Sequence, residues 1–196
     1  MSDNPTNKVK YNLKNVHIAK LTISGDTYTY GTPKAMPGAV SMSLDAEGDN
    51  TPFYADGIVY FRPNTNNGYS GDLEMALIPD WFREDILQEE MDTNKVLFES
   101  ANVTEAQHFA LLFEFDGDQH QVRHCLFNCT VARPSIASQT KEASITPVTE
   151  TLTITADPGA DGYVKSKTTA ETDTTAYDGW YSTVYTNGGS SETDTE

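Results

Sequence analysis

The residues of this chain best suited to metal binding or nucleophilic catalysis are its histidines and cysteines. They are His17, His108, His120, His124, Cys125 and Cys129, and the two cysteines stand in the motif CLFNC. A structural zinc site needs Cys and His pairs that meet in space. On an extended strand the neighbours His124 and Cys125 point to opposite faces, which separates the ligands. We therefore expect partly exposed histidines, core-like cysteines, no metal and no other cofactor.

The spacing of the two cysteines also argues against a disulfide. Four residues apart on a strand, Cys125 and Cys129 face the same way with Cα atoms ~13 Å apart at a rise of ~3.3 Å per residue. A disulfide holds its Cα atoms within ~7 Å of each other.

The N-terminal residues MSDNPTNKVKY are polar, and no run approaches the ~20 apolar residues of a membrane span. Reduced cysteines and the lack of a secretory signal favour synthesis in a cytoplasm.

Acidic residues recur at positions 45, 47 and 49, in the segment Asp45–Asp56 with the sequence DAEGDNTPFYAD. This segment superficially resembles a calcium-binding loop. An EF-hand loop has Gly at its sixth position, a bidentate Glu at its twelfth and helices on both sides. Here Gly48 stands at the fourth position, Asp56 at the twelfth, and the flanks are strand-like. A solvated or subunit-contacting loop is the favoured interpretation.

No motif in the sequence indicates an enzyme. With 29 Asp and Glu residues, carboxylate pairs are expected from composition alone and do not indicate a glycosidase. The GxSxG, HExxH, GxGxxG and P-loop patterns are absent. A cysteine nucleophile would need a positioned histidine, for which the sequence gives no indication. We expect a protein that works by contact with other subunits.

Composition predicts one domain with an appendage. The formal net charge of −16 repels phosphates and anionic lipids, which disfavours nucleic-acid binding but allows DNA to be near without being held. Apolar residues gather before Asp157, so we predict a β domain over residues 1–156 and a polar extension over 157–196. The extension is expected to be surface-exposed or partly disordered. Its Tyr and Trp residues leave open a surface hairpin or a tail that docks on a neighbour.

Period-two alternation of apolar residues predicts a mainly β fold. The expected strands are Val16–Ile23, Thr27–Tyr30, Ala39–Leu44, Gly57–Arg62, Gly68–Ile78, Phe109–Phe115, Val122–Val131 and Glu150–Thr155. The strands around Asp116-Gly117-Asp118 form a hairpin that is apolar on both faces, so it is either central to a two-layer domain or covered by another subunit. One helix, DWFREDILQEEM, is expected from Asp80 as N-cap to Met91, docked on the sheet through Trp81 and Phe82.

Several segments, taken in order, resemble the phage major tail protein (tail tube protein) family of long-tailed siphophages. They are KVKYNLKNVHIAKLT, TPKAMPGAVSMSLDAEGDNTPFYADGIVYF, NNGYSGDLEMALIPDWF, FALLFEFDGDQHQVRHCLFNCTVARPS and TKEASITPVTETLTIT. The resemblance covers about Lys8–Thr155. It implies a β-sandwich or barrel-like core with one flanking helix and a long inter-strand loop.

The resemblance also implies what the protein assembles with. Six subunits form a ring, and rings stack into a tube around a tape-measure protein, between tail-tip and tail-terminator proteins. DNA then passes through the lumen without specific binding, and no membrane is involved. The implied location is the tail of the virion, assembled in the host cytoplasm.

Within this framework, specific residues are expected at the contacts. Aromatic side chains carry interface energy disproportionately, so the long excursion Asp45–Gly71 is expected to bridge successive rings. Its candidate inter-ring contacts are Phe53, Tyr54, Tyr60 and Phe61; the alternative is that they pack within their own subunit. The candidate lumen-facing acids are Asp72, Glu74 and Glu114.

Two other classes of protein remain as alternatives. One is a related β-rich virion component, namely a tail terminator, a head–tail joining protein or a decoration protein, which would form single rings or isolated copies. The other is a carbohydrate-binding β-sandwich, for which the aromatic residues after Asp157 are the only candidates for sugar contacts.

Overall fold

The structure is a computed structural model of the chain and describes residues 6–140 and 147–190. Strands hold 46% of the residues and helices 8%, which confirms the mainly β prediction. The strands are β1 Lys10–Ser24, β2 Thr27–Tyr30, β3 Lys34–Ala35, β4 Ala39–Glu47, β5 Phe53–Ala55, β6 Ile58–Phe61, β7 Gly68–Met75, β8 Glu90–Met91, β9 Leu97–Phe98, β10 Phe109–Gly117, β11 Val122–Val131, β12 Glu150–Asp157, β13 Lys165–Lys167, β14 Tyr185–Thr186 and β15 Gly189–Ser190. The helices are α1 Asp80–Asp85, α2 Thr174–Asp178 and the 3-10 helix η1 Gly179–Tyr181.

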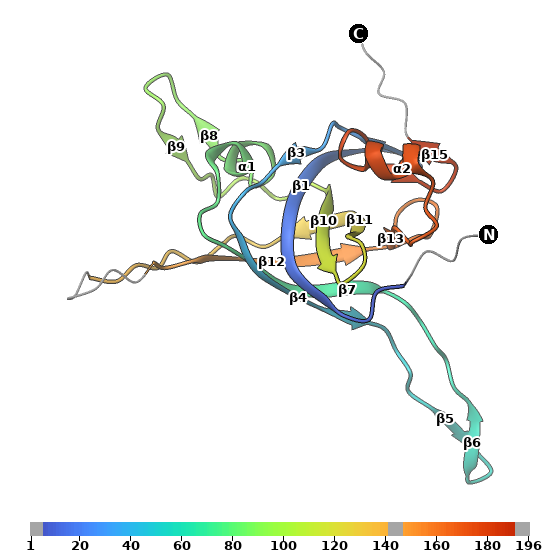
Figure 1. Cartoon of the computed structure of the whole chain (residues 1–196). Coiled ribbons are helices and arrows are strands. Elements are labelled where there is room, and N and C mark those ends of the chain that lie inside the picture. The colour runs from blue at the N-terminus through green and yellow to red at the C-terminus, as the bar shows by residue number, and fades with distance from the viewer. Residues whose placement is uncertain (1–5, 141–146, 191–196) are drawn as a thin grey trace.

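Most strands belong to one antiparallel sheet with the order β2-β1-β10-β11-β12-β7-β4, to which β3 and β13 add on β1 and β11. The sheet curls, so that β1 and β10 lie opposite β4 and β7 (Figure 1). The hairpins β1–β2 and β10–β11 match the two that were predicted. Most expected strands are found, whereas β5 lies in a segment expected to be a loop.

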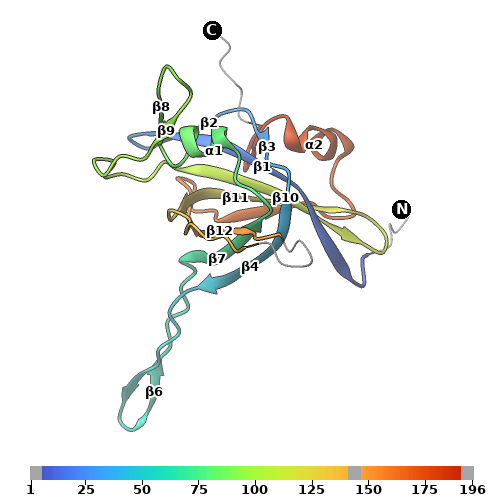
Figure 2. The same ribbon diagram turned by 90° about the vertical axis from the view of Figure 1, so that its left-hand side faces the viewer.

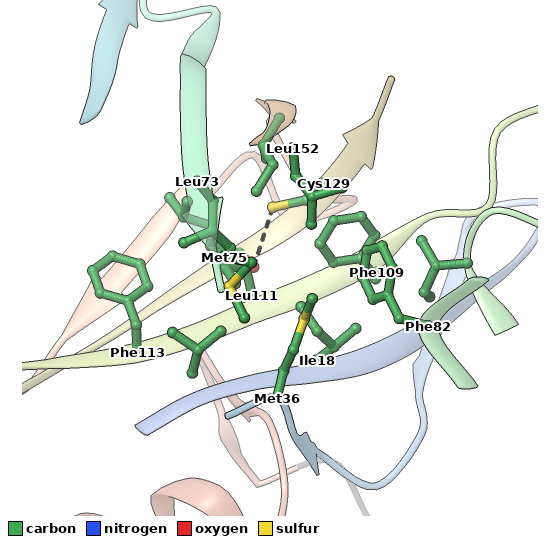
Figure 3. Packing of buried hydrophobic residues seen from close by; sticks show 14 of the residues in the cluster. Ile18, Met36, Leu73, Met75, Phe82, Phe109, Leu111, Phe113, Cys129 and Leu152 are labelled. Atoms are coloured by element: carbon green, nitrogen blue, oxygen red, sulfur yellow. Dashed lines mark hydrogen bonds between the residues drawn. The ribbon is translucent and has the colours of Figure 1, made fainter. Parts of the chain in front are cut away.

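The concave side of the curled sheet encloses the main core. Alternation along β7 turns Leu73 and Met75 inward, where they meet residues of β10 and β12 (Figure 3). The fully or nearly buried members are Val16, Ile18, Met36, Leu73, Met75, Ile78, Phe82, Ile86, Leu87, Phe109, Leu111, Phe113, Leu126, Cys129, Leu152, Ile154 and Ala156. Strands far apart in the sequence therefore share one apolar interior, which is the main source of stability.

Helix α1 is shorter than predicted and begins differently. It spans Asp80–Asp85, with Pro79 rather than Asp80 at the N-cap. The chain turns away at Gln88, whose φ is 59° and whose side-chain amide donates to the Glu105 carbonyl. Phe82 nevertheless docks on the sheet as expected, its ring 6.1 Å edge-on from that of Phe109.

The described part of the C-terminal segment 157–196 packs on the convex face of the sheet (Figure 1). Strand β12 ends at Asp157, one residue past the predicted domain boundary at residue 156. Strand β13 of the C-terminal segment pairs with β11. Trp180 and Val184 of this segment are buried in a second cluster, the outer core, over β1, β10 and β11. Its buried members are Ala19, Leu21, Tyr30, Ala110, Leu112, Cys125, Phe127, Trp180 and Val184. The second apolar face of the β10–β11 hairpin is thus covered by the chain itself.

A β-bulge between β10 and β11 separates the two cysteines. Phe109 pairs with Cys129 but Leu111 pairs with Leu126, so β11 has one extra residue in this interval. The extra residue reverses the side to which later residues point. Cys125 therefore lies in the outer core and Cys129 in the main core. The expectation that both face the same way is wrong, and both are buried free thiols.

A long arm, residues 48–67, leaves the sheet between β4 and β7 and ends in the β5–β6 hairpin (Figure 2). At its base, the Thr65 amide donates to the Asp49 carbonyl across 3.1 Å, and the Asp49 amide donates to Thr65 Oγ1 across 2.7 Å. Gly68 marks the return to the sheet with a φ of 117°, and a Cβ there would collide with the Ala156 carbonyl. The arm projects away from α1, β8 and β9.

Candidate assembly surfaces

The outward face of β4, β7 and β12 carries polar side chains in register. Their pairing forms three rungs across the strands, each combining a carboxylate with two hydroxyls. The rungs are Ser41–Glu74–Thr151, Ser43–Asp72–Thr153 and Asp45–Ser70–Thr155. We call these nine residues the acid–hydroxyl face. The opposite side of the same strands lines the main core, so this face is the outer surface of a rigid layer.

Hydrogen bonds fix the carboxylates of this face. Glu74 accepts from Ser41 Oγ at 2.7 Å and from Thr149 Oγ1 at 2.5 Å. The hydrogen bonds from Thr149 and then Ser41 hold the pKa of Glu74 below its usual value. Thr153 Oγ1 donates to Asp72 across 2.8 Å. The predicted lumen-facing residues Asp72 and Glu74 are therefore brought together on one surface as ordered acceptors.

No lysine or arginine belongs to the acid–hydroxyl face as the three described rungs define it. Glu47, next along β4, adds a further acid and accepts from Ser70 Oγ at 2.5 Å. A surface with acids and no cations repels phosphate groups, because nothing on it can replace their counterions.

The four aromatic residues of the arm are all exposed. The exposed fractions are 61% for Phe53, 62% for Tyr54, 71% for Tyr60 and 61% for Phe61. The alternative that they pack within their own subunit is therefore wrong. Ile58 and Val59 of the same hairpin are also exposed, so six large apolar or aromatic side chains of β5 and β6 face solvent. Their role as inter-ring contacts stays a prediction.

Glu114 does not lie with Asp72 and Glu74. Only 3% of it is exposed, and it is paired with Arg123 at 3.0 Å and Lys14 at 3.4 Å. The prediction that Glu114 is a lumen-facing acid together with Asp72 and Glu74 is therefore wrong. The physical reason is that Glu114 points to the convex face, which the C-terminal segment covers.

The C-terminal segment is fastened over Glu114 by aromatic rings. The guanidinium of Arg123 lies 3.8 Å from the ring centroid of Tyr177, and His17 stacks on Tyr181 at 4.5 Å. Tyr181 Oη also approaches Glu114 Oε2 at 3.4 Å. These aromatics are thus structural in this chain, and the sequence signal for them was their unusual presence in a Thr- and Ser-rich segment.

The histidine and cysteine side chains do not combine into a reactive site. Burial, with the nearby charges of Lys167, Lys165 and Lys10, lowers the pKa of His124 to about 4. Burial raises the pKa of both Cys125 and Cys129, which makes their thiols poor nucleophiles. Across residues 6–140 and 147–190, no group of three His, Cys, Asp or Glu side chains could hold a metal ion.

Comparison with known proteins adds no relative. No model of a known protein family matches the chain, and a search of curated proteins finds no match. The described residues also contain no helix that is long and apolar enough to span a bilayer. The surfaces that indicate function are therefore the acid–hydroxyl face and the arm. Sequence reasoning found Asp72 and Glu74 but placed Asp45 in a loop and missed the hydroxyl neighbours, although the alternation of ETLTIT is the signal for three of them.

Proposed function

We propose that this chain is a structural virion protein, the tail tube subunit of a long-tailed phage, and that it has no catalytic role. Six copies form a ring, and rings stack into the conduit that delivers the genome. The observation that carries the proposal is the acid–hydroxyl face. It is an ordered, cation-free surface on three strands, next to an exposed aromatic arm.

The chemistry of the face suits the wall of a DNA channel. DNA binds proteins chiefly by exchanging its counterions for Lys and Arg side chains. A wall of carboxylates and hydroxyls offers no such exchange, so DNA passes without being held. The intramolecular hydrogen bonds to Asp72 and Glu74 also keep the side chains close to the wall.

The sheet itself supports ring formation. Strand β4 ends the strand order, with β7 as its paired neighbour. Exposed strand edges invite pairing with another chain, and closure of a ring is one way to satisfy them. We infer that the curled sheet is the sandwich- or barrel-like core of a tail tube subunit, and that β4 contributes to joining the acid–hydroxyl faces of six copies into one lumen wall.

The arm supports the stacking of rings. Head-to-tail contacts between different surfaces of identical subunits propagate into a filament. In the proposed tube the aromatic arm residues contact the next ring, the C-terminal segment faces outward, and the tape-measure protein occupies the lumen before DNA. Tail-tip proteins lie at one end of the tube and tail-terminator proteins at the other.

Negative-stain electron microscopy of the purified protein over a range of concentrations tests the proposal. We expect long hollow tubes with a regular axial repeat. Single rings that never stack would instead favour a tail terminator, a head–tail joining protein or a decoration protein. Monomers at every concentration would contradict the proposed function.

A further inference from the structure

The main core is closed at one end and open at the other. At the closed end, α1 lies across the sheet, with Phe82, Ile86 and Leu87 buried against it. Strand β7 runs from the arm to α1, and β10 begins beside α1, where Phe109 contacts Phe82, and runs away from it. The two ends of the curled sheet are therefore chemically different surfaces.

The open end contains a cavity of about 320 Å³. Its lining is mixed. Apolar side chains come from both sides of the curled sheet, with Phe113, Phe115 and Leu126 from β10 and β11 and Met42 and Leu44 from β4, and polar groups of Lys10, Ser43, Tyr69, His124 and Lys165 complete it. An apolar cavity of about 150 Å³ is enough to bind benzene. The cavity therefore has room for an aromatic side chain.

Lysines stand at the mouth of this cavity. Lys10 Nζ lies 5.1 Å from the ring centroid of Phe115, and Lys165 Nζ lies 4.4 Å from that of Tyr69. The described residues that line the cavity include no Asp or Glu. In a chain of net charge −16, a cavity that combines apolar side chains with two lysines and no carboxylate is a distinctive site.

The closed end carries the complementary chemistry. Residues 80–105 contain eight acidic and two basic residues, and Lys34 and Arg133 pair with Asp85 and Glu99 of this segment, so that acids outnumber bases by eight to four. Among them the β8–β9 hairpin exposes apolar side chains, with exposed fractions of 49% for Val96 and 56% for Phe98, and Glu90 is the strand partner of Phe98. Figure 2 places this hairpin at the end of the molecule opposite the arm.

We propose that the open cavity binds the β8–β9 hairpin of a second copy of this chain, with Phe98 against the apolar side chains of the cavity and the mouth lysines beside Glu90. This inference rests on the proposed function and names a contact between successive rings. Two acidic ends repel each other, whereas an acidic end and a lysine-fronted end attract, so the charges select head-to-tail association. Each copy carries both this cavity and the β8–β9 hairpin, so the contact can repeat indefinitely.

Variants on both sides of the contact test this inference. We compare the wild type with K10E/K165E, which reverses the charge of the mouth, and with F98S, which removes the aromatic group. K20E and I23T are the controls at exposed positions of β1 that do not line the cavity; K20E reverses a lysine charge, and I23T replaces an apolar side chain with one that carries a hydroxyl. Sedimentation velocity and electron microscopy measure the concentration needed for assembly, and thermal unfolding confirms that each variant is folded.

We expect K10E/K165E and F98S to raise the required concentration at least about tenfold, and the controls to leave it unchanged. Adding E90K to K10E/K165E should restore assembly. If K10E/K165E and F98S form tubes at the same concentration as the wild type, this inference is overturned and the proposed function is not. Dimers that require Lys10, Lys165 and Phe98 but never grow longer would support the contact between cavity and hairpin and would contradict the proposed tail tube. No self-association of the wild type at any concentration would overturn both.

Discussion

Nε of Arg123 donates a hydrogen bond to Oε2 of Glu114 across 3.0 Å, beneath the C-terminal segment. Arg123 also donates to the Tyr177 carbonyl, and Tyr181 Oη lies 3.4 Å from the same Glu114 oxygen. One ion pair thus connects the β10–β11 hairpin to a segment more than fifty residues away. The Glu114 carboxylate has little access to water and therefore needs a cationic partner. Docking of the C-terminal segment thus depends on the pair of Glu114 and Arg123.

Replacing Arg123 with Met should lower the free energy of unfolding by roughly 2–3 kcal/mol, because Glu114 stays buried with only Lys14 as a cation. Urea denaturation measures this change, and limited proteolysis should show faster cleavage around Tyr177. The double variant E114L/R123M should recover much of the loss. R133M, which breaks the exposed pair with Glu99, should change stability by less than ~1 kcal/mol. Equal effects of R123M and R133M would contradict the argument.

The strands of this fold were predictable because their signal is local. Burial alternates along β7 and β12, so that Leu73, Met75, Leu152 and Ile154 face inward while Asp72 and Glu74 face outward. Each strand records this pattern in its own residues. The lumen candidates Asp72 and Glu74 follow from this alternation, whereas the arm aromatics were chosen by residue type.

Features that depend on distant segments were not predictable. The burial of Glu114 requires the C-terminal segment, whose composition suggests a solvated tail although Trp180 and Val184 dock it. The orientation of Cys125 relative to Cys129 depends on a one-residue bulge that leaves no mark in the alternation of β11 itself. The lysine-fronted cavity combines Lys10 and Lys165, which are far apart in the chain.

Stability should depend on pH through His124. Its ring stacks on Phe113 at 5.1 Å, close to Lys10, Lys165 and Lys167, and burial followed by these charges lowers its pKa from 6.5 to about 4. Between these two pH values the unfolded chain binds more protons, so the free energy of unfolding falls as the pH falls through this window. After allowance for solvent screening we expect a loss of roughly 2 kcal/mol.

The variant H124F isolates this effect, because it keeps the stacked ring and removes the titrating group. Carboxylates with lowered pKa values, such as Glu74 and Asp116, lose their contribution at lower pH in both proteins. The difference between wild type and H124F in urea denaturation from pH 7 to pH 4 therefore reports on His124. A constant difference across that range would contradict the prediction.

The acid–hydroxyl face should become inaccessible to large reagents when tubes form. A cysteine introduced as T155C lies on this face, and T175C on α2 is the control at the outer surface. The two native thiols are buried, so labelling reports on the introduced ones. We expect a small maleimide to label both variants in tubes, and a maleimide with a 5 kDa polymer to label only T175C. Labelling of T155C in tubes by the large reagent would contradict a lumen-facing position.

Shortening the arm should leave a folded subunit that does not polymerise. Deletion of Asp49–Asn67 is the simplest change. A second variant replaces residues 50–64 with an Asn-Gly turn and keeps the hydrogen-bonded pair Asp49 and Thr65 at the base of the arm. The aromatic tip is exposed and adds nothing to the main core, so thermal unfolding should change little. Electron microscopy should show rings or monomers in place of tubes, since the aromatic contacts between rings are gone. Tubes of normal length from the shortened protein would remove the arm from the stacking interface.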